Sequence, residues 1–259
     1  MRKSISIFAI SLLFPIVCCA QDIWGNIKKE AQKGDAVAQY KLGVYYSDIA
    51  PYEAADWFRK AAEQGHAKAQ SNLGYYYYLG LSGVKQDSKQ AVYWFRKSAE
   101  QGEARAQFYL GECYYDGNGV AQNSKQAVYW WRKAAEKGHA KAQNNLGSCY
   151  YKGEVVAQDF KQATNWFRKA AEKGFVEAQF YLGYCYFKGE GVAQDSKQAV
   201  YWFRKSANQG FDDAQYILGL CYHDGEGVTQ NTQQAVYWLR KAAEQGHEGA
   251  KEALDIINH

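Results

Sequence analysis

The feature that most constrains the fold is an internal repeat of 36 residues. Six repeats cover residues 34–245, and the glycines that begin them are Gly34, Gly65, Gly102, Gly138, Gly174 and Gly210. The second repeat has one added residue near Leu81 and Ser82, and the first has 31 residues because its loop is cut short. Two helix-length patterns in a repeat of this size predict an α-solenoid, in which each repeat buries its apolar face only against its neighbours.

The first helix of each repeat has a core face and an internal glycine. In the third repeat, Ala106, Leu110, Cys113 and Tyr114 stand at i, i+4, i+7 and i+8, which is one helical face. Gly111 has an equivalent in every repeat, although a glycine inside a helix costs about 1 kcal/mol relative to alanine. We therefore expect the second helix to pack against bare backbone at this glycine.

The second helix of each repeat has its own apolar face, formed in the third repeat by Ala127, Trp130, Trp131 and Ala134. Asp195, followed by Gln198, predicts a capping box at the start of this helix, and other repeats place Asp87, Asn123, Asp159 and Asn231 there. The first repeat instead has Pro51 at the first helical position. The preceding loop has two glycines suited to positive φ, and Val155 replaces the second one in the fourth repeat. We expect the loop at Val155 to be strained or rearranged.

Residues 1–20 have the pattern of a cleavable secretory signal peptide. The apolar stretch Ile5–Val17 has 13 residues, whereas a transmembrane helix needs about 20. Cleavage would make Gln21 the new N-terminus. The alternative is lipid attachment at Cys19, which Cys18 disfavours because Gly, Ala or Ser should precede the lipidated cysteine. We expect an exported protein, periplasmic or secreted, with no integral membrane segment after cleavage.

The chain is therefore expected to divide into a signal peptide, a capping helix at each end and six repeats. The predicted ranges are 1–20 for the signal peptide, 21–33 for the N-terminal capping helix, 34–64, 65–101, 102–137, 138–173, 174–209 and 210–245 for the repeats, and 246–259 for the C-terminal capping helix. The formal net charge is only +4, which does not favour a nucleic-acid partner.

The repeat pattern AQxxLGxxYxxGxGVxxDxxxAxxWxRKAAExG, as it stands in residues 178–210, resembles the Sel-one-like repeat, a relative of the tetratricopeptide repeat. The resemblance covers nearly all of the mature chain. It implies an all-α fold, a right-handed α/α superhelical solenoid of six tandem helix-turn-helix repeats with capping helices. It also implies a non-catalytic scaffold for a protein or peptide partner, commonly exported or periplasmic in bacteria.

The mature chain has four cysteines, Cys113, Cys149, Cys185 and Cys221. They recur 36 residues apart on the core face of the first helices. Packed helices lie about 8–10 Å apart, whereas a disulfide needs Cα atoms about 4.4–6.8 Å apart. We expect four free, buried thiols and no metal site. Cysteine-rich members of the family carry two cysteines per repeat and join each helical pair, a pairing that does not carry over to this chain.

Some cysteine-rich relatives are described as penicillin-binding or β-lactamase-like, so an envelope hydrolase is the alternative function. The one Ser-x-x-Lys match is Ser82-Gly83-Val84-Lys85, in a loop, and no Ser-Asp-Asn or Lys-Thr-Gly follows it. The histidines are dispersed and expected to be exposed at helix starts or elsewhere on the surface: His66, His139, His223, His247 and His259. We predict no catalytic residue and no cofactor.

The candidate functional surface is the side of the first helices away from their core face. We call it the groove face, and it comprises the positions equivalent to 105, 108, 109, 112, 115 and 116; in tetratricopeptide-like solenoids this side lines the concave groove. Half of its aromatic residues are expected to pad neighbouring repeats, and the rest to form a tyrosine-rich binding strip. The predicted partner-binding residues are Lys68, Asn72, Tyr75, Arg105, Tyr109, Lys141, Asn145, Tyr181, Tyr184 and Tyr216.

Charge on the groove face is ordered along the chain. Its first position is basic in the second to fourth repeats, and then acidic as Glu177 and Asp213. Asn72 follows Lys68 by four residues, and Asn145 follows Lys141 in the same way, a placement that looks like the tetratricopeptide carboxylate clamp. The hypothesis is an extended partner segment with its acidic part near repeats two to four. The alternative is a charge pattern that serves only solubility.

Overall fold

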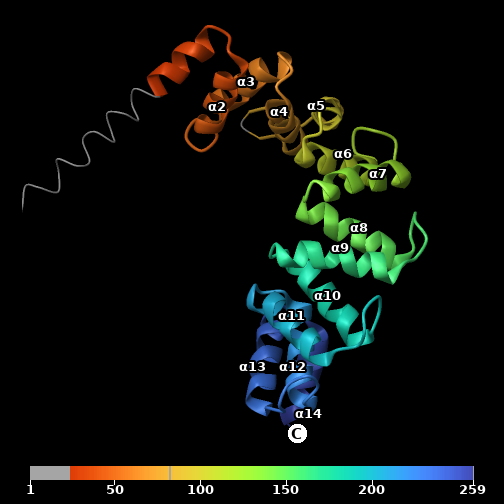
Figure 1. The fold of residues 1–259 in the computed structure, drawn as a ribbon. Helices are drawn as coiled ribbons and strands as arrows, with labels where there is room; N and C mark the ends of the chain where they lie inside the picture. The colour runs from red at the N-terminus through yellow and green to blue at the C-terminus, as the bar shows by residue number, and fades with distance from the viewer. Residues whose placement is uncertain (1–23, 82, 259) are drawn as a thin grey trace, which may run out of the picture. The chain divides into compact units, whose positions relative to one another are not determined.

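A computed structural model describes residues 24–81 and 83–258. The chain divides into two compact units, one ending at Gln122 and the other starting at Asn123, and each is described by itself. Within each unit, a first helix packs against the second helix of its own repeat (Figure 1). The third repeat is the exception, because its two helices belong to different units. No strand occurs in the described ranges, so the prediction of an all-α solenoid is confirmed.

First and second helices alternate along the described ranges. In the first unit, residues 24–32 are helical and precede α2 (Ala36–Tyr46), α3 (Pro51–Glu63), α4 (Ala67–Leu79), α5 (Ser88–Glu100) and α6 (Ala104–Asp116). In the second unit the helices are α7 (Ser124–Glu136), α8 (Ala140–Lys152), α9 (Phe160–Glu172), α10 (Val176–Lys188), α11 (Ser196–Asn208), α12 (Asp212–Asp224), α13 (Thr232–Glu244) and α14 (Glu248–Asn258).

In the first, second, fourth, fifth and sixth repeats, a large side chain of the second helix packs on the glycine of the first helix. Phe203 is fully buried, and a Cβ atom added at Gly183 would lie 2.8 Å from its Cδ1 atom. The same contact recurs between Gly147 and Phe167. The expected approach of the second helix to bare backbone is therefore confirmed. The two tryptophans of α7 differ, because Trp131 is buried whereas Trp130 is half-buried beneath Lys133.

The second helices begin as predicted, with one difference. The Asp195 side chain accepts a hydrogen bond from the backbone N–H of Gln198 at 3.0 Å. The backbone N–H of Asp195 donates to the Tyr186 carbonyl at 3.0 Å, so this donor is satisfied by the first helix of the same repeat and not by a Gln198 side chain. The capping box is thus half formed. Pro51 is the first residue of α3, as predicted.

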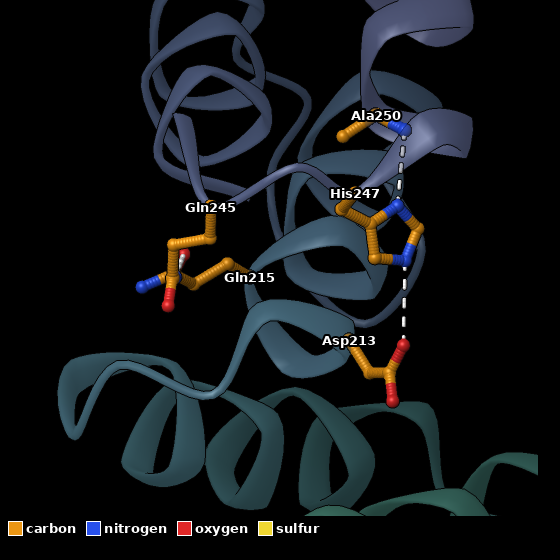
Figure 2. A network of polar contacts seen from close by, with 5 residues as sticks. All are labelled: Asp213, Gln215, Gln245, His247 and Ala250. Atoms are coloured by element: carbon orange, nitrogen blue, oxygen red, sulfur yellow. Dashed lines mark hydrogen bonds and ion pairs between the residues drawn. The ribbon is translucent and has the colours of Figure 1, made fainter. Parts of the chain in front are cut away.

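Three of the histidines lie at helix starts, as predicted, but they are half-buried and not exposed. Nδ1 of His66, His139 and His247 accepts the backbone N–H of the third residue of the following helix, which is the position of an N-cap. Burial lowers the pKa of His66, which favours the neutral imidazole that this bond requires. His247 also contacts Asp213 through Nε2 at 3.3 Å, as Figure 2 shows.

A glutamine pair joins successive repeats and was not anticipated from the sequence. Gln215 Nε2 donates to the Ala207 carbonyl at 3.1 Å. Gln215 Oε1 accepts from Gln245 Nε2 at 2.9 Å, and Figure 2 shows this pair. Gln245 also donates to the carbonyl of Gly210 at 3.0 Å. Equivalent pairs are Gln39 with Gln64, Gln70 with Gln101, and Gln179 with Gln209. Each pair ties a first helix to the end of the preceding repeat and to the second helix of its own.

Candidate functional site

Four of the predicted partner-binding residues come together in the first unit, on α4 and α6. Arg105 Nη1 donates to Asn72 Oδ1 at 3.0 Å. The Arg105 guanidinium carbon lies 4.5 Å from the ring centroid of Tyr75 and 5.7 Å from that of Tyr109, within range of a cation–π interaction. We call Asn72, Tyr75, Arg105 and Tyr109 the arginine cluster.

Tyr109 has a structural role as well as a place in the arginine cluster. Its ring stacks on fully buried Phe95, with centroids 5.3 Å apart and planes at 13°. Burial raises the pKa of Tyr109, and its hydrogen bond with Tyr75 raises it further, whereas Arg105 lowers it. The ring therefore fills the contact between two repeats, and the hydroxyl belongs to the polar side of the cluster.

The clamp-like arrangement predicted for Lys68 and Asn72 differs in detail from the structure. The side-chain oxygen Oδ1 of Asn72 already accepts a hydrogen bond from Arg105. The arginine of one repeat therefore binds the asparagine side chain of the preceding repeat. Lys68 is exposed at the start of α4. Lys141 is exposed and Asn145 half-buried on α8; both belong to the second unit and are described apart from the arginine cluster.

In the second unit, most of the predicted tyrosines pack between repeats. Tyr181 stacks on buried Phe167, with centroids 5.0 Å apart, as Tyr109 does on Phe95. Tyr216 stacks on the imidazole of His247 at 4.4 Å. Tyr184 is half-buried, with the Lys188 ammonium 5.7 Å from its ring centroid. Tyr184 also packs against the hydrophobic core formed mainly by α11 and α12. All three tyrosines therefore have the expected padding role.

Two polar contacts on the groove face were not predicted from the sequence. The Tyr151 hydroxyl donates to Glu190 Oε2 at 2.6 Å, and burial together with this bond raises the pKa of Tyr151. Asp213, one of the two acidic groove positions, contacts His247. The residues in each contact lie more than 30 positions apart, so only the repeat geometry would have placed them together.

The described residues contain no group of three His, Cys, Asp or Glu side chains that could hold a metal ion. Likewise, no helix within the described ranges is both long and apolar enough to cross a membrane. Ser82, the candidate nucleophile of the alternative hydrolase, lies outside the described residues, as do the signal peptide and Cys19.

The cysteines lie on the first helices, and their exposure is not uniform. Cys113, Cys185 and Cys221 are buried, whereas Cys149 is half-buried, so the expectation of burial is wrong for Cys149. Burial raises the pKa of Cys113 and of Cys221 to about 12, and that of Cys149 and of Cys185 to about 11. At neutral pH these groups are thiols, which are poor nucleophiles.

We expect iodoacetamide at a pH of about 8 to alkylate the folded protein slowly, because little thiolate forms at that pH. Cys149 should react first since it is the most accessible of the four. Peptide mass mapping after timed alkylation measures the order, and the unfolded protein, in which all four cysteines react, is the control. Fast labelling of Cys113, or disulfide-linked peptides without reductant, would contradict the assignment of free, unreactive thiols.

Comparison with known proteins agrees with the architecture. The Sel1 repeat matches residues 36–66, 67–103, 104–139, 140–175, 176–211 and 212–247. A protective antigen of uropathogenic Escherichia coli with this fold is 39% identical over 90% of this chain and 51% of its own, with a TM-score of 0.82. The chain thus spans about half the length of that protein.

A second solved structure is similar over most of both chains. A Sel1 repeat protein of Oxalobacter formigenes is 34% identical over 85% of this chain and 88% of its own, with a TM-score of 0.77. No curated protein sequence matches the chain. Because the repeat matches six consecutive segments that cover most of the sequence, this chain belongs to the Sel1 repeat family.

Proposed function

We propose that this chain is an exported, non-catalytic scaffold that binds an extended, partly acidic segment of a partner protein on its groove face. Sel1 repeat proteins generally mediate protein–protein interactions and are typically non-catalytic. Helices account for most of the described residues, so this architecture offers mainly a binding surface. The basic start and apolar stretch of residues 1–20 support export.

The observation that carries the proposal is the arginine cluster. Its bond to Asn72 and its contact with Tyr109 use part of the five N–H donors of Arg105. Tyr75 and Tyr109 hold the guanidinium in place, so less side-chain entropy is lost when a carboxylate binds. Lys68, exposed on the same helix as Asn72, adds a second positive charge. Arginine and tyrosine between repeats are the residue types that dominate binding energy at protein interfaces.

The test is quantitative affinity capture from envelope extracts with the wild-type protein and a Lys68→Ala/Arg105→Ala variant. The proposal expects the captured partner to fall about tenfold with the variant, because loss of an interface arginine typically costs more than 1 kcal/mol. A Lys125→Ala/Arg240→Ala variant, altered at exposed positions of second helices, is the control with the same net charge and should capture as the wild type does.

Three results would oppose the proposal. If the two double variants, each folded by circular dichroism, captured equal amounts of the partner, the groove face would not be the binding surface. Finding the protein in the cytoplasm with residues 1–20 still attached would contradict the proposed export. Acylation of Ser82 by a labelled β-lactam would replace the non-catalytic scaffold with the hydrolase.

A further inference from the structure

A large cavity in the first unit lies outside the groove face. It has a volume of about 850 Å³ and is bounded by α3, the loop after α4, the start of α5 and Asn118 with Gly119 from the loop after α6. We call it the loop cavity. It is lined by the loop of the second repeat, which has an added residue near Leu81 and Ser82, and by α3, which follows the shortened loop of the first repeat.

A related cavity in the second unit is less than half this size. It has about 380 Å³, between α9 and the loop residues Gly191 and Val192. In such regular repeats the loop rests directly on the start of the preceding second helix, as Gly191 does on the Phe160 carbonyl. At the loop cavity, Gly83 lies instead against the ring of Tyr52. The departures from the repeat are thus associated with a wider opening.

The polar lining of the loop cavity has an excess of positive charge. Arg59, Lys85 and Lys89 line it together with two carboxylates, Asp56 and Asp87. Asp56 Oδ1 accepts from Arg59 Nη1 at 2.7 Å. Asp87 Oδ1 accepts the backbone N–H of Lys89 at 2.9 Å and caps α5. Both carboxylates are therefore occupied, and no ion pair of Lys85 or Lys89 is found within residues 24–81 and 83–258.

The lining also offers groups suited to a polypeptide. Tyr52 is 72% exposed, so an incoming side chain can pack on its ring without displacing a protein neighbour. Asn118 and Ser88 supply an amide and a hydroxyl, which can bond to a peptide backbone. A volume of this size accommodates several residues of an extended chain, whereas one phosphate would fill only a small part of it.

The loop cavity and the arginine cluster lie on different faces of α4. Tyr77 lines the cavity, and Tyr75 belongs to the cluster. Residues two apart in an α-helix are rotated by about 200° around the helix axis, so their side chains lie on nearly opposite sides of the helix. Substitutions at one site can therefore be made without touching the other.

We propose that the loop cavity is a second binding site, which takes an acidic peptide segment of a partner protein. Lys85 and Lys89 bind its carboxylates, Asn118 and Ser88 bond to its backbone, and Tyr52 packs against one of its side chains. This site is separate from the groove face of the proposed function.

The experiment measures binding of a labelled peptide of alternating glutamate and glycine by fluorescence anisotropy at low salt. The Lys85→Gln/Lys89→Gln variant is expected to bind about tenfold more weakly, because two charge-assisted contacts are lost. Tyr52→Ala should weaken binding about threefold. The matched control is Lys125→Gln/Lys197→Gln, which has the same net charge and alters the positions equivalent to Lys89 in regular repeats; it should bind as the wild type does.

Several outcomes would overturn the proposal. They are no binding to the wild type at a peptide concentration of about 1 mM, equal weakening by the two lysine double variants, and equal binding of a glutamine–glycine peptide. Displacement of the peptide by inorganic phosphate at similar concentrations would assign the cavity to a small anion instead. Arg105→Ala should leave this affinity unchanged, so failure here and failure of the groove face are distinguishable.

Discussion

Gly183→Val is expected to destabilise the protein by about 3 kcal/mol, because it overfills a tightly packed contact. The Cβ atom would lie 2.8 Å from the Phe203 ring and 3.2 Å from the Ala199 carbonyl oxygen. Neither neighbour moves easily, because the Phe203 ring is fully buried and the Ala199 carbonyl oxygen belongs to the backbone of α11. Valine has the better helix propensity, by a few tenths of a kcal/mol, which is too little to offset the clash.

The measurement combines urea denaturation with hydrogen exchange of α10 and α11. Gly25→Val is the matched control, because Gly25 is also helical and an added Cβ there would meet no atom within 4 Å. Phe203→Ala should remove much of the penalty of Gly183→Val, so the double variant is expected to lose less stability than the sum of the single losses. A neutral Gly183→Val variant, or strictly additive losses, would contradict a direct contact between this glycine and Phe203.

The repeated core could be predicted from the sequence because it depends on residues close together in the chain. Leu110, Cys113 and Gly111 mark one helix by their spacing alone, and the 36-residue period then assigns the same environment to every repeat. Helix starts were predictable for the same reason, since Asp195 caps a helix that begins at the next residue.

The arginine cluster could be predicted only in part. The sequence placed Asn72 and Arg105 on one surface, but their bond joins residues 33 positions apart. Its formation depends on how far one repeat is displaced from the next. The aromatic residues show the same limit, because Tyr109 and Tyr75 have identical chemistry. Only the position of Phe95 makes the first of them largely a packing residue.

The loop cavity could not be predicted, because it arises where the sequence departs from the repeat. A periodic pattern predicts what its copies share, and a shortened or lengthened loop has no second copy for comparison. The same limit applies to Val155. The missing glycine predicted a strained or rearranged loop but did not indicate which backbone conformation the valine adopts. In the structure Val155 keeps the positive φ of the glycines, at 70°, and is the one non-glycine residue with positive φ among those described.

At the second glycine position of the loop, we expect Gly191→Val to lower the stability of the protein and Val155→Gly, in the preceding repeat, to raise it. Gly191 has a φ of +73°, and a Cβ atom there would lie 2.1 Å from the Phe160 carbonyl oxygen and 2.7 Å from Thr164 Oγ1. Thr164 Oγ1 is itself bonded to the Glu190 carbonyl at 2.9 Å. Gly191→Val should therefore cost about 3 kcal/mol, from backbone strain and from displacement of the loop.

Val155→Gly should instead stabilise the protein by about 1 kcal/mol or slightly less, because it relieves a strained β-branched residue at the expense of some chain entropy. Denaturation midpoints of both variants measure the contrast, and Val155→Ala, which keeps the positive φ, is the control expected to gain little. A stable Gly191→Val variant would show that the loop shifts freely away from α9. A destabilised Val155→Gly variant would show that the exposed valine side chain contributes packing that outweighs its backbone strain.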